Sequence, residues 1–505
     1  MICSSAGLLR RILCLSLLLF LLLPLHAQET GREAGLSPSE DITFDAKKAF
    51  SPPNTYGTPV HEDNDGKKHY LVAVTGMLLP IFVIHAWSRF VVNAGWAQVS
   101  ASSFCDWRRT VEFDDDYVWT NFVLHPFQGS LYYMAARNAN LNRFESLGLT
   151  ALGDFLWEWF AETTPPSVND LTYSFIGGFA VGEMMYRLSL EAEQIADFFG
   201  YVVNPMRIWS DPLTGTKPRG RVGNIYEISM KYKLGTVRSY SYSAYDSVQS
   251  PAEHFPIFFS PDLTIVYNDP YGHDSNDPYS QFEFRFALGV GAGSGRWRGM
   301  VGEEQDLMYD ILLSSSGMLF SRSPDFGSDR KTTVGMVLDY DVRWQSLIDF
   351  SALASGFAFK QQIQHATSTT EWQVHLAWNL LGMTDYYYFH RSPDSNMAGA
   401  RRDYSYMFGP AVFFRWNWLT KKGFAIKNDV HSYANYDFAF QTQPNQSTGW
   451  EFITFYDVNL EMPLPRELFL GLGLTCYIKK AVYAEVENVF QHAYFASFYL
   501  KKQVH

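Results

Sequence analysis

Hydrophobic and polar residues follow two different periods in the two halves of the chain. Up to about residue 208, apolar positions recur every three to four residues, which is the spacing of one helix face. From about residue 225 they recur at every second position, which is the spacing of a strand with one polar face. Residues 209–224 contain Pro and Gly that break both periods. The sequence therefore predicts an α+β chain, with a helical domain over 71–208, a linker over 209–224 and a strand-rich domain over 225–505.

The apolar faces of the C-terminal strands are rich in aromatic residues. In YSYMFGPAVFFRWNW, every second residue from Tyr404 to Trp418 is apolar, and the segment from Tyr226 to Leu234 alternates in the same way. A soluble sandwich would bury these rows and expose two long charged faces, whereas a membrane barrel turns them toward lipid. The sequence thus predicts an antiparallel transmembrane β-barrel of roughly 12–14 strands, closed so that no edge is unpaired in lipid.

Connection lengths favour the same architecture. Short turns such as TKKG and PLPRE occur together with longer polar loops such as QTQPNQSTG, NDPYGHDSNDP and RSPDSNMAGARR. Outer-membrane barrels have short turns at one end and long loops at the other. The polar faces then predict a lumen with charges of both signs, from Glu227, Lys231, Lys233, Glu283, Arg285, Glu371, His375, Lys427, Asp429 and Asp437.

The helical domain opens with the apolar segment LVAVTGMLLPIFVIHAW, which begins at Leu71. A transmembrane helix needs about 20 apolar residues, whereas Pro80 interrupts this run, and His85 and Arg89 end it. The segment is therefore predicted to be a buried helix rather than an inner-membrane span. Acidic residues on the following helices also argue against an inner-membrane bundle, because charges are costly within a bilayer.

The predicted helix over residues 144–163 has a polar ridge along one face. The ridge consists of residues at intervals of four, which fall on one side of a helix, namely Ser146, Thr150, Asp154, Glu158 and Glu162. The other positions are mostly Leu, Phe and Trp, which is more apolar surface than a solvent-facing helix carries. We therefore expect this helix to be buried on most sides.

Two more helices are predicted, over residues 124–138 and 168–198. The second follows Ser167, and Asp170 lies three residues beyond that serine, which is the layout of a capping box. Small residues then recur at intervals of four, at Ser174, Gly178 and Gly182. Such a groove allows another helix to approach closely.

Several residues of the helical domain fall into ordered motifs. They are His125-Pro126, Gly129, Tyr132-Tyr133, Ala136-Arg137, Trp157-Glu158, Glu162, Pro166-Ser167, Asp170, Gly178 and Gly182-Glu183. In this order they resemble the motifs of an uncharacterised bacterial envelope family, domain of unknown function 3943, over about residues 121–187. The resemblance implies an envelope protein. It assigns no role to any residue, since the family has no established activity.

The N-terminus carries the pattern of a secretory signal peptide over residues 1–27. Arg10 and Arg11 precede an apolar run that ends at Leu23. Residues 28–70 are polar and predict a tether without a core of its own. We therefore expect export to the cell outer membrane, with outer-membrane lipid and the barrel-assembly machinery as partners.

Charge and cysteine content narrow the partners further. Loss of the signal peptide leaves 38 basic and 52 acidic residues, a net charge of −14. A nucleic-acid partner is disfavoured, because phosphate binding needs a basic surface. Cys105 and Cys476 remain, and two isolated thiols are favoured over a disulfide between them.

Three functional hypotheses follow from the acidic ridge. Like charges at intervals of four repel, and burial raises the cost unless cations or protons compensate. The first hypothesis is structural, in which the ridge joins the helices to each other or to the lumen wall, as a helical plug or a periplasmic domain. Its compensating residues are Arg137, Arg143, Arg187 and His125, and Tyr132, Tyr133, Arg137 and Asp170 are the candidate binding residues.

The second hypothesis is catalytic, with a lipid or cell-wall bond as substrate. A general base or a metal could be provided by His125, Asp154, Glu158, Glu162 and Glu183. The chain lacks HExxH, paired-His and GxSxG motifs, so that no cofactor is predicted and no residue is assigned to a metal. The third hypothesis is passage of a small solute or lipid through a gated barrel. A structural or transport role in the envelope is the main prediction, and an enzyme using His125, Glu158 and Glu162 is the alternative.

Overall fold

The computed structural model describes residues 67–106, 110–215, 224–243, 253–296, 304–345, 348–385, 404–437 and 447–504. The predicted signal peptide, most of the predicted tether and the loop RSPDSNMAGARR lie outside these residues. All the described residues belong to one compact unit.

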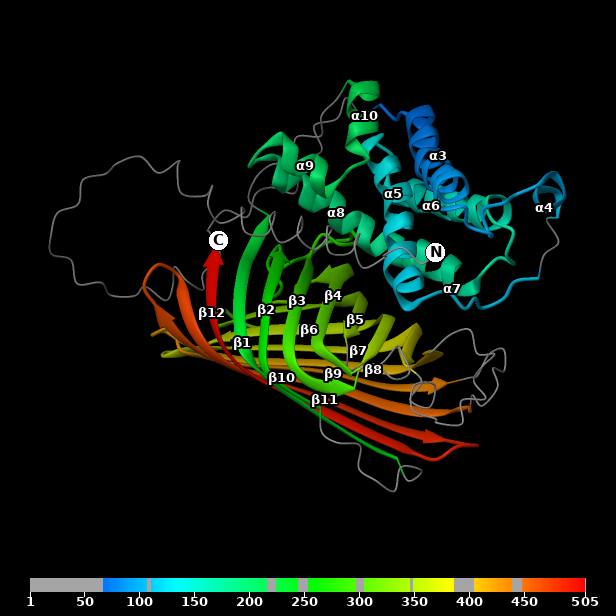
Figure 1. The fold of residues 1–505 in the computed structure, drawn as a ribbon. Helices are drawn as coiled ribbons and strands as arrows, with labels where there is room; N and C mark the ends of the chain where they lie inside the picture. The colour runs from blue at the N-terminus through cyan, green and yellow to red at the C-terminus, as the bar shows by residue number, and fades with distance from the viewer. Residues whose placement is uncertain are drawn as a thin grey trace. The chain divides into compact units, whose positions relative to one another are not determined.

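The first part of this unit is helical (Figure 1). Its helices are α3 (Tyr70–Trp87), α4 (Ala101–Cys105), α5 (His125–Asn138), α6 (Arg143–Leu156), α7 (Val168–Thr172), α8 (Gly178–Glu193), α9 (Asp197–Val203) and α10 (Arg207–Thr214). Between or beyond them lie π-helical turns, a rare conformation, at Ser88–Val92, Thr120–Leu124, Trp157–Ala161 and Tyr173–Gly177.

The Ser167 hydroxyl accepts a hydrogen bond from the Asp170 backbone N–H at 3.3 Å and so caps α7, which confirms one half of the predicted capping box. The other half does not form, because the Ser167 backbone N–H donates to Glu158 at 2.8 Å. The predicted groove of small residues is confirmed. Small residues bring α5 against the segment that leads into α8. A Cβ atom at Gly129 would lie 1.8 Å from the Ser174 carbonyl oxygen, and one at Gly178 would lie 2.7 Å from the Gly129 Cα.

The second part is a closed antiparallel barrel of twelve strands, in which each strand pairs with its neighbours in sequence and β1 pairs with β12. The closed twelve-stranded barrel confirms the predicted fold class. The strands are β1 (Ile225–Ser243), β2 (Glu253–Tyr267), β3 (Phe282–Arg296), β4 (Glu304–Arg322), β5 (Arg330–Gln345), β6 (Asp349–Gln364), β7 (Ser368–Asp385), β8 (Tyr404–Thr420), β9 (Ala425–Asp437), β10 (Gly449–Leu464), β11 (Leu468–Tyr483) and β12 (Val489–Val504).

Ion pairs between strands that are not neighbours identify the lumen face. Arg415 on β8 donates to Glu283 on β3 at 2.9 Å, and Arg285 on β3 lies 3.7 Å from Asp457 on β10. These pairs must cross the interior, because β3 contacts only β2 and β4 in the sheet. The charged rows therefore face the lumen and the aromatic rows face outward, as the alternation predicts.

The helical domain packs against the outer face of the barrel wall. Tyr340 directly precedes Asp341 in the alternation along β5, and Asp341 lies 3.5 Å from His431 on the non-adjacent strand β9, across the interior. Tyr340 therefore points outward. Its hydroxyl donates to the backbone carbonyl of Phe122, and the Tyr173 hydroxyl donates to the Leu381 carbonyl at 2.9 Å. This corrects the predicted positions of the helices in the lumen or beneath it. The physical reason is that the apolar docking surface lies on the outward rows, while the lumen is filled by the barrel's own side chains.

Burial along the outward rows supports this placement. The outward side chain of Tyr340 is 1% exposed, whereas Leu376 on the outward face of β7 is 61% exposed. Helical and outward barrel residues share one apolar cluster, which includes Phe122, Tyr173, Phe179, Leu338, Tyr340, Leu353, Leu381, Tyr404 and Tyr406. The helices therefore cover one sector of the wall and leave the rest of its apolar surface free.

Two helices of the domain expose apolar side chains on their outer sides. Helix α3 continues through Pro80 and exposes many of its large apolar side chains, including Phe82 at 71%, which corrects the prediction of a buried helix. On α6 the polar ridge faces inward, and Phe144 on the opposite side is 82% exposed. The prediction that this helix is buried on most sides is therefore wrong. Four ridge residues, Ser146, Thr150, Asp154 and Glu158, are buried as one row, whereas Glu162 is half-buried and follows the helix in an extended conformation.

The described connections differ from the predicted arrangement at one point. The segment NDPYGHDSNDP joins β2 to β3 and lies at the same barrel end as the short turns after β8 and β10. It contacts the helical domain, because Arg143 donates to Asp277 at 2.9 Å and Arg187 donates to the Pro278 carbonyl at 3.3 Å. One long connection therefore lies at the barrel end that has the short turns, whereas the sequence predicts long loops at the other end only. Cys105 and Cys476 are free thiols, as predicted.

Candidate functional site

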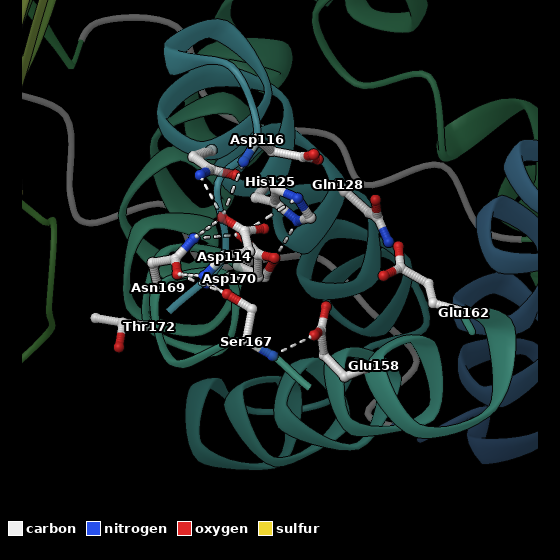
Figure 2. Close-up of polar contacts among 12 residues, drawn as sticks. Asp114, Asp116, His125, Gln128, Glu158, Glu162, Ser167, Asn169, Asp170 and Thr172 are labelled. Carbon is white, nitrogen blue, oxygen red and sulfur yellow. Dashed lines mark hydrogen bonds and ion pairs between the residues drawn. The ribbon is translucent and has the colours of Figure 1, made fainter. Parts of the chain in front are cut away.

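His125, the first residue of α5, lies in a buried polar cluster built by separate segments (Figure 2). Its Nε2 is 3.4 Å from Oδ1 of Asp170 on α7, and its Nδ1 is 3.4 Å from the Ser174 hydroxyl. Glu158 directs its carboxylate toward Asp170 and His125. One potential ligand atom from each of His125, Glu158 and Asp170 lies within 4.8 Å of the other two. We call these three residues the His125 cluster.

Three π-helical turns meet at the His125 cluster. His125 directly follows the turn Thr120–Leu124, Glu158 belongs to Trp157–Ala161, and Ser174 belongs to Tyr173–Gly177. The extra residue in a π turn changes the direction of the side chains that follow it, and such turns occur frequently at functional sites. Three of the π-helical turns of the domain therefore lie at the His125 cluster.

An amide and carboxylate network extends the cluster to the barrel. Asn169 donates from Nδ2 to Asp170 at 2.8 Å and to Asp114 at 2.9 Å. Asn121 donates to Asp114 at 2.7 Å and to the Tyr404 hydroxyl at 2.8 Å. The sequence analysis missed Asp114, Asn121 and Asn169. Its one available signal was the acidic run that begins at Asp114 just before α5.

Within the His125 cluster, the Glu158 carboxylate has the fewest polar partners. It is 1% exposed, and its Oε2 accepts a hydrogen bond from the Ser167 backbone N–H at 2.8 Å. Its Oε1 has no hydrogen-bond partner, and neither has Oδ1 of Asp154, one turn earlier on the same buried ridge. Burial raises the pKa of Glu158 well above its usual value, and the nearby charges of Glu162 and Asp154 raise it further.

The remaining members respond to burial in opposite directions. Burial raises the pKa of Asp170 well above its usual value, and the charge of Asp114 adds to this shift. Burial lowers the pKa of His125 to about 4, since the charged imidazolium is disfavoured away from water. At neutral pH the cluster therefore contains a neutral imidazole beside acids that resist ionisation.

A second buried carboxylate, Glu183 on α8, has very different surroundings. Its carboxylate accepts hydrogen bonds at 2.9 Å from Arg137 and Arg187, at 3.3 Å from Arg143 and at 2.9 Å from the Tyr133 hydroxyl. Burial alone would raise the pKa of Glu183, but the three guanidinium charges outweigh it and lower the pKa to about 2. Glu183 is a fully compensated ion-pair centre.

The structure sorts the predicted site residues into groups. His125, Glu158 and Asp170 meet in the His125 cluster, with Asp154 on the same buried face. Glu183, Arg137 and Tyr133 form the separate ion-pair centre. Two residues join neither group: the Tyr132 hydroxyl accepts from Gln128 at 2.6 Å, and the half-buried Glu162 accepts from Thr164 at 3.0 Å.

The lumen of the barrel is occupied by its own side chains. Inward-facing aromatic rings pack across it, with ring centres 4.7 Å apart for Phe350 and Tyr433 and 5.4 Å apart for Phe350 and Phe455. Two interior cavities of about 150 Å³ and about 50 Å³ lie among the charged rows. Each of these two spaces has room for only a few water molecules.

The closed barrel with an apolar outside and a charged inside defines a β-barrel protein of the outer-membrane type, with a helical domain on its wall. Residues 110–206 match the family model Domain of unknown function (DUF3943). The match confirms the resemblance predicted from the motifs and extends it on both sides. The family description gives no activity.

Solved structures similar to the chain are membrane barrels. An outer membrane channel from Pseudomonas putida F1 has 8% identity and a TM-score of 0.28, over 54% of this chain and 94% of that chain. A Pseudomonas aeruginosa FadL homologue has 8% identity and a TM-score of 0.25, over 59% and 94%. KdgM porin has 9% identity and a TM-score of 0.21, over 55% and 99%. These values assign no function. No curated protein matches the chain significantly.

Proposed function

We propose that the protein is an exported outer-membrane protein with a structural role, in which a rigid filled barrel holds the helical domain against lipid. This proposal rests on one observation, which is that the barrel and the helical domain both expose apolar side chains on their outer surfaces. The free outward rows of the barrel expose large apolar side chains, and so do helices α3 and α6. The polar side of α6 and the charged rows of the barrel point inward, which is the distribution expected where the surrounding solvent is lipid.

Helix α3 supports a lipid environment for the helical domain. Among the described helices, the segment Tyr70–Val92 is long and apolar enough to cross a membrane, and only 28% of its apolar window is buried. Its exposed side chains include Leu71, Phe82, Val83, Trp87, Phe90 and Val91. Contiguous apolar surface of this kind on a folded protein marks contact with another apolar phase.

The filled lumen favours a structural role over transport. Charged rows inside the barrel are paired across it, as for Arg415 with Glu283 at 2.9 Å and Arg285 with Asp457 at 3.7 Å. Opening a passage would separate such pairs and leave buried charges uncompensated, which is costly. The His125 cluster is also enclosed, so that a substrate could reach it only if helices moved apart. The enzyme alternative is therefore less supported than the structural role.

Quenching by brominated lipids tests this proposal. In a Cys105→Ser, Cys476→Ser background, a bimane fluorophore is attached to Phe82→Cys on α3, to Leu376→Cys on the barrel wall or to Lys421→Cys in an exposed turn. We expect strong quenching at positions 82 and 376 in reconstituted vesicles and weak quenching at position 421. Quenching at position 82 no stronger than at 421 would show that α3 does not contact lipid.

A further inference from the structure

We propose that His125, Glu158 and Asp170 bind a single divalent transition-metal ion of the Zn²⁺ or Mn²⁺ class, which ties three segments of the helical domain together. This inference concerns the interior of the helical domain and does not depend on the lipid contact proposed above. It rests on the charge balance of the cluster, on the position of its donor atoms and on the chemistry of those donors.

Charge balance separates the two buried carboxylate centres of the domain. Glu183 is paired with three arginines. Glu158 and Asp170 face each other with His125 as the basic group beside them, and the described ion pairs of Glu158 and Asp170 include no Lys or Arg. Buried carboxylates are normally paired or bound to a metal. The arginine pairs satisfy this rule at Glu183, and a bound cation would satisfy it at the His125 cluster.

The donor atoms are placed for a common ion. Glu158 Oε1 is buried, has no hydrogen-bond partner and belongs to the carboxylate that points at Asp170 and His125 (Figure 2). Its other oxygen is fixed by the Ser167 backbone N–H, and Asp170 is fixed by Asn169. Donor atoms within 4.8 Å of one another need to move by less than about 1 Å each to reach metal bonds of about 2.0–2.2 Å.

The types of donor indicate the class of ion. An imidazole nitrogen suits Zn²⁺ and other first-row transition metals, whereas Ca²⁺ and Mg²⁺ prefer oxygen donors alone. Two carboxylates beside one imidazole fit Zn²⁺ or Mn²⁺. The amide of Asn169 and the carboxylate of Asp114 lie behind Asp170 and would orient it, as outer partners of metal ligands do. All three ligands are buried, which is typical of a closed structural site.

The experiment measures metal binding and unfolding of the full chain purified in detergent micelles. After treatment with a chelator, the protein is titrated with ZnCl₂, MnCl₂ or CaCl₂ in a calorimeter, and thermal unfolding is followed by circular dichroism. We expect one Zn²⁺ or Mn²⁺ ion per chain and an increase in the unfolding temperature when that ion binds. CaCl₂ should bind much more weakly.

Three variants make the test specific. Glu158→Gln and His125→Asn should weaken Zn²⁺ binding by at least about tenfold and remove the metal-dependent rise in unfolding temperature. Glu158→Gln should leave the unfolding temperature of the metal-free protein nearly unchanged, because glutamine has the shape of the protonated side chain, so that a failure to fold is recognised. Glu145→Gln, at the exposed start of the same helix, is the matched control and should bind like the wild type.

Three results would overturn the proposal. The first is the absence of Zn²⁺ and Mn²⁺ binding by the folded wild-type protein. The second is equal binding by the wild type and Glu158→Gln, which would place the ion elsewhere. The third is a preference for Ca²⁺ over both transition metals. None of these results affects the lipid-quenching test, so the two proposals fail independently.

Discussion

Glu158 and Glu183 are buried carboxylates in the same helical domain, and their basic neighbours decide how each responds to pH. At Glu183 the three guanidinium groups overcome the desolvation of the carboxylate, whereas no such charge counters the burial of Glu158. The sequence predicts Arg137, Arg143 and Arg187 as compensating residues for the ridge. The structure shows that they serve Glu183 on α8 instead. Spacing along a helix identifies a shared face but does not identify the partner across the interface.

The ion-pair centre at Glu183 predicts a loss of stability in acid. The folded pKa of about 2 lies below the ordinary value of 4.5, so this contribution is fully present above about pH 4.5 and is lost as the pH falls toward 2. The shift corresponds to a contribution on the order of 3 kcal/mol. Thermal unfolding of the helical signal should therefore shift to lower temperature below pH 4.5.

The matched variant for this prediction is Glu183→Gln, which retains the shape of the side chain and cannot titrate. It should be less stable than the wild type at pH 6, because it removes the carboxylate that compensates the buried Arg137 and Arg187. Its unfolding temperature should depend less on pH between 4.5 and 3. An equal pH dependence in both proteins would mean that other groups control the acid response.

At the scale of elements, the close contact between α5 and the start of α8 is the most sensitive feature of the helical domain. A methyl group at Gly129 would overlap the Ser174 backbone carbonyl, which cannot move without shifting a helix, whereas one at Gly148 on α6 would meet nothing within 4 Å. Gly129→Ala should therefore destabilise the domain by about 2–3 kcal/mol or more. Gly148→Ala should stabilise it by up to about 1 kcal/mol, because alanine favours the helix. Chemical denaturation of the two variants checks both signs, and a neutral Gly129→Ala would contradict the observed packing.

The elements themselves were largely predictable, and their orientation was not. Alternation along the strands from Tyr226 to Leu234 and from Tyr404 to Trp418 predicts the barrel and its polar lumen correctly. The ridge on α6 has the same period whether its polar side faces water or a protein interior, so the pattern cannot show that Phe144 points outward. Asp114 and Asn169 are 55 residues apart and lie at or next to irregular segments, where no period links them. The site therefore emerged only from the tertiary contacts.

At the scale of the whole molecule, the barrel wall and the helical domain share one apolar interface, and its location distinguishes the observed arrangement from a plug. Leu338 lies on the outward face of β5 beneath the helices, and Leu376 lies on the outward face of β7 away from them. Leu338→Ala leaves a cavity in that interface and should cost about 2–5 kcal/mol of docking energy. We expect faster cleavage of the helical domain by trypsin in detergent, while the heat-dependent gel mobility of the closed barrel is unchanged.

The comparison with Leu376→Ala decides where the helices sit. That substitution trims a side chain that no helix covers, so it should alter neither trypsin cleavage nor the mobility of the barrel. If the helices filled the lumen, both leucines would face away from them and the two variants would behave alike. A difference confined to Leu338→Ala requires the helices to lie on the outer wall, where the barrel's own packing leaves the lumen closed. With the helices on the outer wall, the exposed apolar side of α3 and the uncovered part of the barrel wall face the same surroundings, which are lipid under the proposed function.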